Sequence, residues 1–265
     1  MRSKRGLTAL LLVLTLGSIF ITSCDTTAGK DAGELIAVAE NKLKESPYTV
    51  SVITTFTTED EDMKDTVNSL GVADVTLRVN GEDFAAEMNT VVGDFYINKS
   101  YTVVDNILYH KTVAELGTES ATVKEKALVG TEERAFILSD AGLAAKVNHK
   151  DFDTVTVEKS DVGYTVICTD IKNDSLADLT SILAAHFEGT GATVNVGNVN
   201  YRIELADGAY VKTTLKADYK VLLDGVEYEL CMKMSSTYSY GSEIAVSAPT
   251  DAAEYKDTEY ANIIK

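Results

Sequence analysis

The sequence of 265 residues predicts an α+β protein built on one wide, curved antiparallel β-sheet. Apolar side chains recur at every second position along most of the chain, which is the period of a strand with one buried and one solvated face. Parallel strands, which are covered on both faces, would instead produce continuous apolar runs. Helical spacing occurs in only a few segments, so the strands are expected to follow one another in a wide meander covered by few helices.

The N-terminal segment predicts export from the cytoplasm. A basic start is followed by an almost wholly apolar run from Leu7 to Ile21, and small residues precede Cys24. This composition is typical of a secretory signal peptide, and the run is too short for a membrane span. Ile21 to Cys24 resembles the bacterial lipobox, in which the cysteine becomes a diacylated N-terminus. We therefore expect a signal peptide over residues 1–23, a diacylglyceryl anchor on Cys24, and a position on the extracytoplasmic face of the cell membrane.

The rest of the chain is expected to be a flexible tether over residues 24–33 and a single α+β domain over residues 34–265. The 41 acidic and 24 basic residues give a net charge of −17. Such a surface repels nucleic acid and anionic headgroups, so we expect no nucleic-acid binding and membrane attachment only through Cys24. The sequence does not specify a protein partner.

The first element of the domain is a helix from Asp31 to Ser46, because Leu35, Val38, Ala39 and Leu43 form an apolar stripe and Pro47 disfavours its continuation. From Tyr48 to Phe56 the period changes to two. The same alternation predicts further strands over residues 75–79, 84–88, 101–104, 107–110, 155–157, 164–168, 199–205, 211–223 and 226–234.

Other segments connect or cover these strands. Asp105 and Asn106 predict a hairpin turn, and Asn173 to Ser175 predict the N-cap of an amphipathic helix that continues to Phe187. Between Leu116 and Asn148 the period breaks down, and we expect a loop with short helices over residues 132–138 and 141–147. An edge strand over residues 244–249 is expected to lead into a short helix or turn.

No pattern of catalytic or metal-binding residues is present, so we expect no enzyme activity, no metal and no cofactor. His110, His149 and His186 stand in separate segments without ligand spacing. The acidic run from Glu59 to Asp62 lacks the order of a calcium loop and predicts a solvated loop or helix start. Cys168 and Cys231 could form one disulfide, but we favour two buried free thiols.

The apolar face of the sheet must be covered by the helices or enclose a cavity. Full coverage would give an ordinary core, and partial coverage would leave room for a hydrophobic ligand. If a cavity exists, its lining should come from residues that share the apolar face: Phe56, Leu77, Met88, Tyr201, Ile203, Tyr228, Leu230, Met232 and Met234.

The order of these features resembles the LolA/LolB/LppX-type superfamily of envelope lipoproteins and lipoprotein carriers. The resemblance depends on the lipobox at Cys24, the tether, a helix that meets Ser46-Pro47-Tyr48, many meandering strands, and a closing segment that ends in Pro249-Thr-Asp-Ala252. It implies an incomplete β-barrel wrapped around helices, whose concave side accepts acyl chains. The segment between Leu116 and Asn148 has no counterpart in this pattern.

Two functions follow from these expectations. The first is a membrane-anchored binding protein that holds a lipid or acyl chain without covalent chemistry. The alternative is a structural or interaction lipoprotein with a filled core that contacts an envelope protein. A transporter's substrate-binding lipoprotein is less consistent with the sequence, because such proteins need alternating βαβ units.

Overall fold

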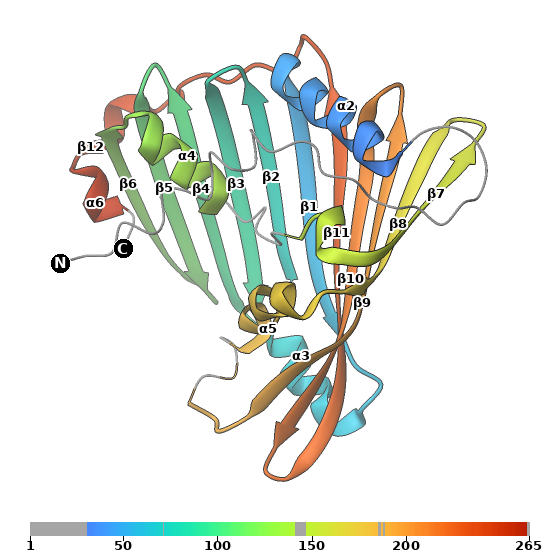
Figure 1. Ribbon diagram of the computed structural model, residues 1–265. Coiled ribbons are helices and arrows are strands. Elements are labelled where there is room, and N and C mark those ends of the chain that lie inside the picture. Colours follow the sequence, from blue (N-terminus) through green and yellow to red (C-terminus); the bar gives the residue numbers. More distant parts are fainter. Residues whose placement is uncertain (1–30, 71, 141–146, 185–186, 188, 264–265) are drawn as a thin grey trace, which may run out of the picture. The chain divides into compact units, whose positions relative to one another are not determined.

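The computed structural model describes residues 31–70, 72–140, 147–184, 187 and 189–263. The predicted signal peptide, Cys24 and most of the predicted tether lie outside these residues, as do His186 and most of the helix expected over 141–147. Asp31–Lys265 forms one compact unit. It contains a wide antiparallel sheet with a few helices, so the predicted α+β class with a wide curved sheet is confirmed (Figure 1).

The elements follow the predicted order for most of the chain. The helices are α2 (Ala32–Glu45), α3 (Lys64–Leu70), α4 (Thr131–Asp140), α5 (Leu176–Ala184) and α6 (Tyr260–Ile263). The strands are β1 (Tyr48–Thr57), β2 (Val72–Asn80), β3 (Asp83–Val92), β4 (Phe95–Val104), β5 (Ile107–Leu116), β6 (Glu119–Leu128), β7 (Phe152–Ser160), β8 (Gly163–Ile171), β9 (Thr193–Ala206), β10 (Ala209–Leu223), β11 (Val226–Tyr240) and β12 (Lys256–Asp257).

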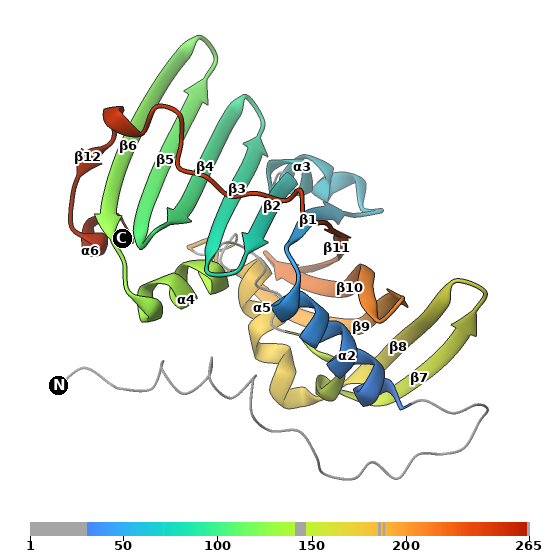
Figure 2. The same ribbon diagram turned by 90° about the horizontal axis from the view of Figure 1, so that it is seen from above.

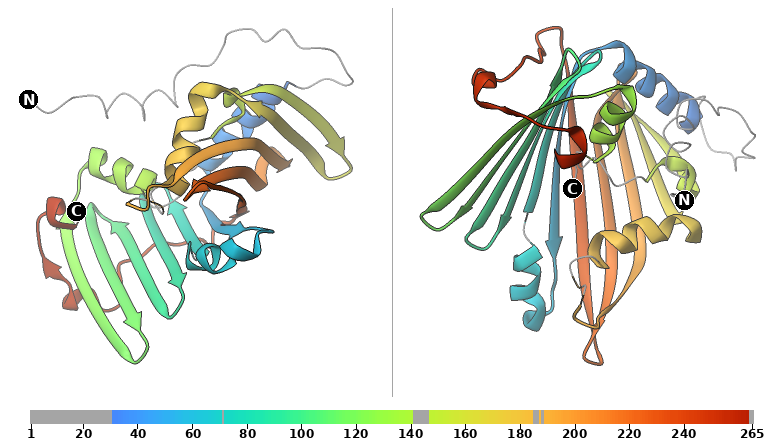
Figure 3. Two further views of the ribbon diagram at one scale, coloured as in Figure 1. Left: turned by 90° about the horizontal axis from the view of Figure 1, so that it is seen from below. Right: turned by 90° about the vertical axis from the view of Figure 1, so that its left-hand side faces the viewer.

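Two meanders make up the sheet, whose order is β12-β6-β5-β4-β3-β2-β1-β11-β10-β9-β8-β7. The first meander runs from β1 to β6 and the second from β7 to β11. They join where β1 pairs with β11, in a register that places Tyr48 opposite Tyr240 and Phe56 opposite Met232. We call this β1/β11 pair the seam. Figures 2 and 3 show the strands on either side of the seam diverging as two wings, so the sheet is strongly curved.

Tight turns set the register of the hairpins. At the β4/β5 turn, Asp105 and Asn106 have φ values of 51° and 65°, which is the left-handed region that a type I′ turn requires at both central positions. Asparagine and aspartate tolerate this region better than other residues that carry a Cβ. The hairpin predicted from these two residues is therefore confirmed.

The face of the sheet that carries the buried apolar side chains is called the inner face here. Helix α2 packs against β10 and α5 against β9, and Figures 1 and 2 show α2, α4 and α5 on the same side of the sheet. Asp31 caps α2 by accepting a hydrogen bond from the backbone N–H of Gly33 at 3.2 Å. Leu35, Ile36 and Ala39 of this helix are buried in a core over the β8–β11 wing. A second core covers the β2–β6 wing, and it includes Ile137 of α4.

Two predictions about secondary structure are wrong. The segment after Leu116 contains β6, a full strand, rather than a loop. Its apolar alternation is weak because most of the strand is exposed or half-buried on both faces. Residues 244–249 form no strand. They belong to a segment that runs past the ends of β1 to β4 (Figure 2) and then pairs β12 with β6 in parallel.

That C-terminal segment is held to the outer face of the first wing. The side-chain amide of Asn80 donates to the carbonyl of Ile244 at 3.2 Å, and Tyr109 meets the ring of Tyr255 edge-on at 5.4 Å. The Lys124 ammonium is 2.7 Å from an Asp251 carboxylate oxygen and also pairs with Glu254. These contacts hold the segment in place, and its strand β12 pairs with Glu125 and Lys126 and so covers part of the edge of β6 that would otherwise expose unpaired backbone groups.

The remaining sequence predictions concern small groups. Cys168 and Cys231 are both free. Cys168 is buried on the inner face of β8, whereas Cys231 is half-buried and alternates with the inward-facing Met232, so the two thiols lie on opposite faces. The acidic run starts a helical segment, as expected, with a 3-10 turn over Glu61–Met63 that leads into α3. None of the helices in the described residues is long and apolar enough to cross a membrane.

Candidate ligand-binding site

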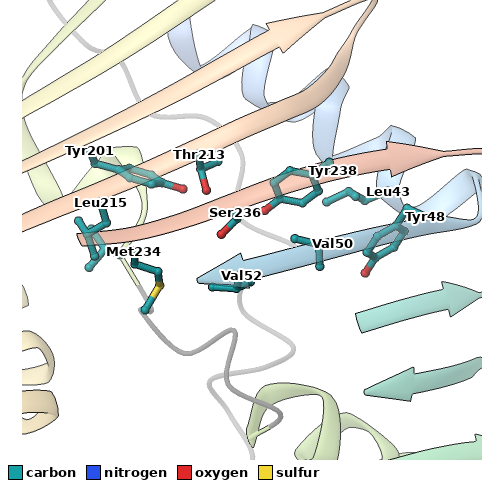
Figure 4. Close-up of a pocket in the computed structure, with 11 residues that line it drawn as sticks. Leu43, Tyr48, Val50, Val52, Tyr201, Thr213, Leu215, Met234, Ser236 and Tyr238 are labelled. Atoms are coloured by element: carbon teal, nitrogen blue, oxygen red, sulfur yellow. The ribbon is translucent and has the colours of Figure 1, made fainter. Parts of the chain in front are cut away.

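A pocket of about 150 Å³ lies on the inner face at the seam (Figure 4). Its walls come from three neighbouring strands of the second meander, from β1, from α2 and from the segment before β7. The lining residues are Leu43, Tyr48, Val50, Val52, Val147, Tyr201, Thr213, Leu215, Met234, Ser236 and Tyr238.

The period-two geometry of the strands brings these side chains together. On β11, Met234, Ser236 and Tyr238 are alternate residues and therefore share the inner face. Ser236 stands opposite Val52 of β1 on one side and Thr213 of β10 on the other. The pocket thus extends across four adjacent strands, β1, β11, β10 and β9, and Leu43 from α2 lies beside it.

Hydroxyl groups interrupt the apolar lining. Thr213 and Ser236 are only 6% and 8% exposed, although both are polar. Tyr238 stacks on Tyr210 with 5.3 Å between ring centroids, and Tyr201 stacks on Phe152 at 6.3 Å. Because these rings are fixed by their neighbours, their hydroxyls are preorganised for a ligand's polar group.

The phenols of the pocket are neutral at physiological pH. Burial raises the pKa of Tyr48 to about 12, with a smaller contribution from Tyr238. Burial also raises the pKa of Tyr201 and Tyr238, while a hydrogen bond with Thr213 acts in the opposite direction for both. Neutral phenols donate and accept hydrogen bonds without carrying charge. The pocket therefore suits an uncharged, mostly apolar group.

Of the nine candidate residues, Tyr201 and Met234 line this pocket. Ile203, Leu230 and Met232 are at most 2% exposed and belong to the core of the second wing, where Phe56 and Tyr228 pack against them. Leu77 and Met88 lie in the other core. The structure thus places all nine on the inner face and brings two of them to the pocket.

Most of the lining residues are not predicted by the sequence. The alternation that ends at Met234 in the predicted strand continues through Ser236 and Tyr238, but the run Ser-Ser-Thr-Tyr-Ser-Tyr is too polar to be recognised as an inner face. Thr213 was included in a predicted strand, yet its hydroxyl gave no reason to expect burial. A period of two that continues past Met234, regardless of polarity, predicts Ser236 and Tyr238 on the inner face.

The described residues contain no group of three His, Cys, Asp or Glu side chains placed to hold a metal ion. Cys168 lies near Tyr201, and burial raises the pKa of its thiol to about 11, so it is a neutral thiol. His149 is buried in a 3-10 turn capped by Asn148, and burial lowers its pKa. Apolar surface with a few placed polar groups is typical of a ligand-binding pocket.

Comparisons with known proteins do not assign a family. No family model matches the chain, and no curated protein matches it. Among solved structures, the ywiB protein from Bacillus subtilis is 10% identical, with 74% of this chain and 93% of that chain covered and a TM-score of 0.15. An inactive mutant of the CurJ dehydratase is 10% identical over 78% of this chain and 80% of its own, with a TM-score of 0.12. The 12:0-ACP thioesterase from Umbellularia californica is 11% identical over 76% of each chain, with a TM-score of 0.13.

Proposed function

We propose that this protein is a lipid-anchored lipoprotein of the LolA/LolB/LppX type that binds an acyl chain or similar hydrophobic ligand, without catalysis, at the extracytoplasmic face of a cell membrane. In this proposal the curved sheet acts as an incomplete barrel with α2, α4 and α5 on its concave side. The observation that carries the proposal is the pocket at the seam, which combines apolar walls with neutral hydroxyls.

The size of the pocket limits what it could hold. Its volume of about 150 Å³ is below the range of roughly 300–1,000 Å³ for sites that enclose drug-sized molecules. Engineered apolar cavities of about 150 Å³ take up a single benzene molecule. We therefore expect the pocket to take part of an acyl chain, with the remainder along the inner face.

The anchor proposed at Cys24 would keep this binding site near a supply of lipid. Each buried CH₂ of an acyl chain contributes about 0.8 kcal/mol, and a single chain gives only reversible membrane binding. Two chains on Cys24 would hold the protein stably at the bilayer despite its excess of acidic residues, which becomes larger when Arg2, Lys4 and Arg5 are removed with the signal peptide. Incorporation of a palmitate analogue in cells tests this step, and Cys24→Ser should abolish it.

Ligand binding is tested with the full chain carrying Cys24→Ser, purified from membrane-containing cells. Native mass spectrometry should show a species heavier than the polypeptide, and a fluorescent acyl chain should bind. Ser236→Leu adds apolar volume inside the pocket and should lower the affinity at least tenfold. Ser239→Leu, on the exposed side of the same strand, is the matched control and should not. A bare polypeptide mass together with failure to bind fluorescent lipids would count against the proposal.

A second candidate function is supported by the packing of the inner face. Ile203, Leu230 and Met232 are fully buried among protein side chains, so most of the apolar surface over the second wing is already covered. A filled core fits the structural or interaction lipoprotein that contacts an envelope protein. Crosslinking in cells would support this function if it recovers one stable partner and if purified protein carries no ligand.

A further inference from the structure

The inner face of the first wing changes from buried to exposed along β4, β5 and β6. On β4, Val103 is fully buried and Tyr101 is 8% exposed. Farther along the same face, Lys99 is exposed, Ile97 is half-buried and Phe95 is 38% exposed. The face is therefore covered at one end of the strands and open at the other.

The covered end lies beneath two helices. Ile137 of α4 and Ile263 of α6 are buried with Val103 and Leu108 in the core of this wing. None of the described helices lies over the other ends of β4 to β6 in Figure 1. There Leu116 is 58% exposed and Val123 is 49% exposed, although both lie on the apolar inner face.

The register makes the open surface continuous. Phe95 stands opposite Leu116, Ile97 stands opposite Ala114, and Thr112 pairs with Val123 on β6. From Lys99 to Phe95 the strand advances four residues, which spans about 14 Å at roughly 3.4 Å per residue. This apolar strip has the length of a medium acyl chain rather than that of a single side chain.

A polar belt separates the covered and open parts. Lys99 lies opposite Thr112, and in the next row His110 lies opposite Glu125. The His110 side chain is 10% exposed and stacks on Tyr101 with 4.9 Å between ring centroids. Its Nε2 is 3.1 Å from the Thr112 hydroxyl.

The other ring nitrogen of His110 has no hydrogen-bond partner among the described residues. It is buried, and at 3.9 Å the nearest Glu125 oxygen is too far away for a hydrogen bond. Burial lowers the pKa of His110, and Lys99 acts in the same direction while Glu125 opposes both. In the tautomer in which Nε2 accepts from Thr112, the neutral ring presents an N–H at Nδ1.

The lysines of this acidic protein differ in whether they form an ion pair. Lys124, Lys126 and Lys220 each lie within 3.7 Å of a carboxylate oxygen. Within the part of the chain that the structure describes, Lys99 forms no such pair, and neither do other lysines such as Lys212 and Lys233. Lys99 and the unpartnered Nδ1 N–H of His110 thus lie at the end of an apolar strip. This arrangement is complementary to an apolar chain that ends in one negative charge.

We propose that the open inner face of β4 to β6 binds a single-chain carboxylate, with its apolar chain along Ile97, Phe95, Leu116 and Val123 and its carboxylate on Lys99. This inference rests on the proposed function, since it requires acyl-chain binding on the inner face, and it names the headgroup and the place. A single positive charge matches a single negative charge. Glu125 on the same face disfavours a headgroup that carries two.

The test compares decanoate, decanol and decyltrimethylammonium by isothermal titration with the full chain carrying Cys24→Ser. Decanoate should bind best and the cation worst. Lys99→Gln should weaken decanoate binding about fivefold, the effect of one partly exposed charge pair, and change decanol binding less than twofold. Lys233→Gln, an exposed lysine on the outer face of β11, is the matched control and should change neither.

A second variant tests the placement of the chain. Leu116→Gln should weaken decanoate and decanol equally, whereas Ser239→Leu, on the exposed side of β11, should leave the binding of both unchanged. Equal affinities for all three probes, or a decanoate affinity that Lys99→Gln does not alter, would overturn the headgroup assignment alone. If neither decanoate nor decanol binds, the proposed function is contradicted as well.

Discussion

The tyrosines around the seam should make the protein unusually sensitive to alkaline pH. In the folded protein, burial is the largest cause that raises the pKa of six phenols: Tyr48, Tyr201, Tyr210, Tyr219, Tyr238 and Tyr240. In the unfolded chain a phenol ionises near pH 10. A raised pKa in the folded state means that the stabilisation is present below pH 10 and is lost as the pH rises toward the folded pKa.

The size of the loss follows from the difference in bound protons. At pH 11, a tyrosine that remains protonated when folded and ionises near pH 10 when unfolded reduces the free energy of unfolding by about 1.4 kcal/mol. Six such groups would give about 8 kcal/mol as an upper limit. Tyr210 and Tyr219 are buried but the other four are half-buried, so we expect about 4 kcal/mol. This is a large share of the roughly 5–15 kcal/mol that stabilises a typical domain.

Urea unfolding at pH 9 and pH 11, followed by circular dichroism, measures the loss directly. Lysines also lose charge in this range, so Tyr219→Phe serves to isolate the tyrosine contribution. At pH 9 this variant should be about 1 kcal/mol less stable, because Tyr219 donates a buried hydrogen bond to the Leu179 carbonyl at 3.0 Å. Its further loss between pH 9 and pH 11 should be about 1.4 kcal/mol smaller than in the wild type. Phenolate absorbance that rises near pH 10 by the amount expected for all 13 tyrosines, while the near-UV spectrum stays native, would refute the reasoning.

Three other predictions concern the sheet and its edges. Gly163→Ala should cost more than about 3 kcal/mol of stability in urea unfolding, because its Cβ would lie 1.9 Å from the Leu205 carbonyl oxygen. Gly225→Ala is the control: it lies in a turn with open space around it and should cost only about 1–2 kcal/mol. Equal losses in the two variants would contradict the close approach of the Leu205 backbone to Gly163. Met232→Ala, at a fully buried site, should cost about 2–5 kcal/mol in the same assay, and a loss below 1 kcal/mol would mean that this core is not packed as described. Lys124→Gln removes the cation shared by Asp251 and Glu254. It should speed hydrogen exchange at the Thr258 amide, which donates to the Lys126 carbonyl at 2.9 Å. Unchanged exchange would show that these ion pairs do not hold the C-terminal segment.

The sequence was sufficient to predict most of the strands, because one face of each is buried and the other is solvated. Strand β10 shows this directly, since Leu215, Ala217 and Tyr219 are buried while Lys216 and Lys220 are exposed. The pattern is weak where a strand has little burial on either face. Strand β6 was missed for this reason: Ala127 is its only buried residue.

The candidate sites were less predictable, since they depend on which strands become neighbours. Ser236 lines the pocket because β11 pairs with both β1 and β10, and local sequence does not determine the first of these pairings. Lys99 interrupts an apolar face, and its position between Met88 and Thr112 follows only from the register of two hairpins. Strand pairing and its register, rather than the periodicity of single strands, therefore determine which side chains meet in this fold.

The seam also affects how the chain can fold. Tyr48 and Tyr240 are paired at the centre of the sheet, yet almost the whole domain separates them in sequence. Each wing can assemble hairpin by hairpin from local contacts, but the centre closes only when β11 has left the ribosome or translocation channel. Pairings of such high contact order are slow to form. Until then the free edge of β1 can pair with other chains. This protein should therefore depend on a chaperone that shields β1, and this dependence should be stronger than its strand content alone would suggest.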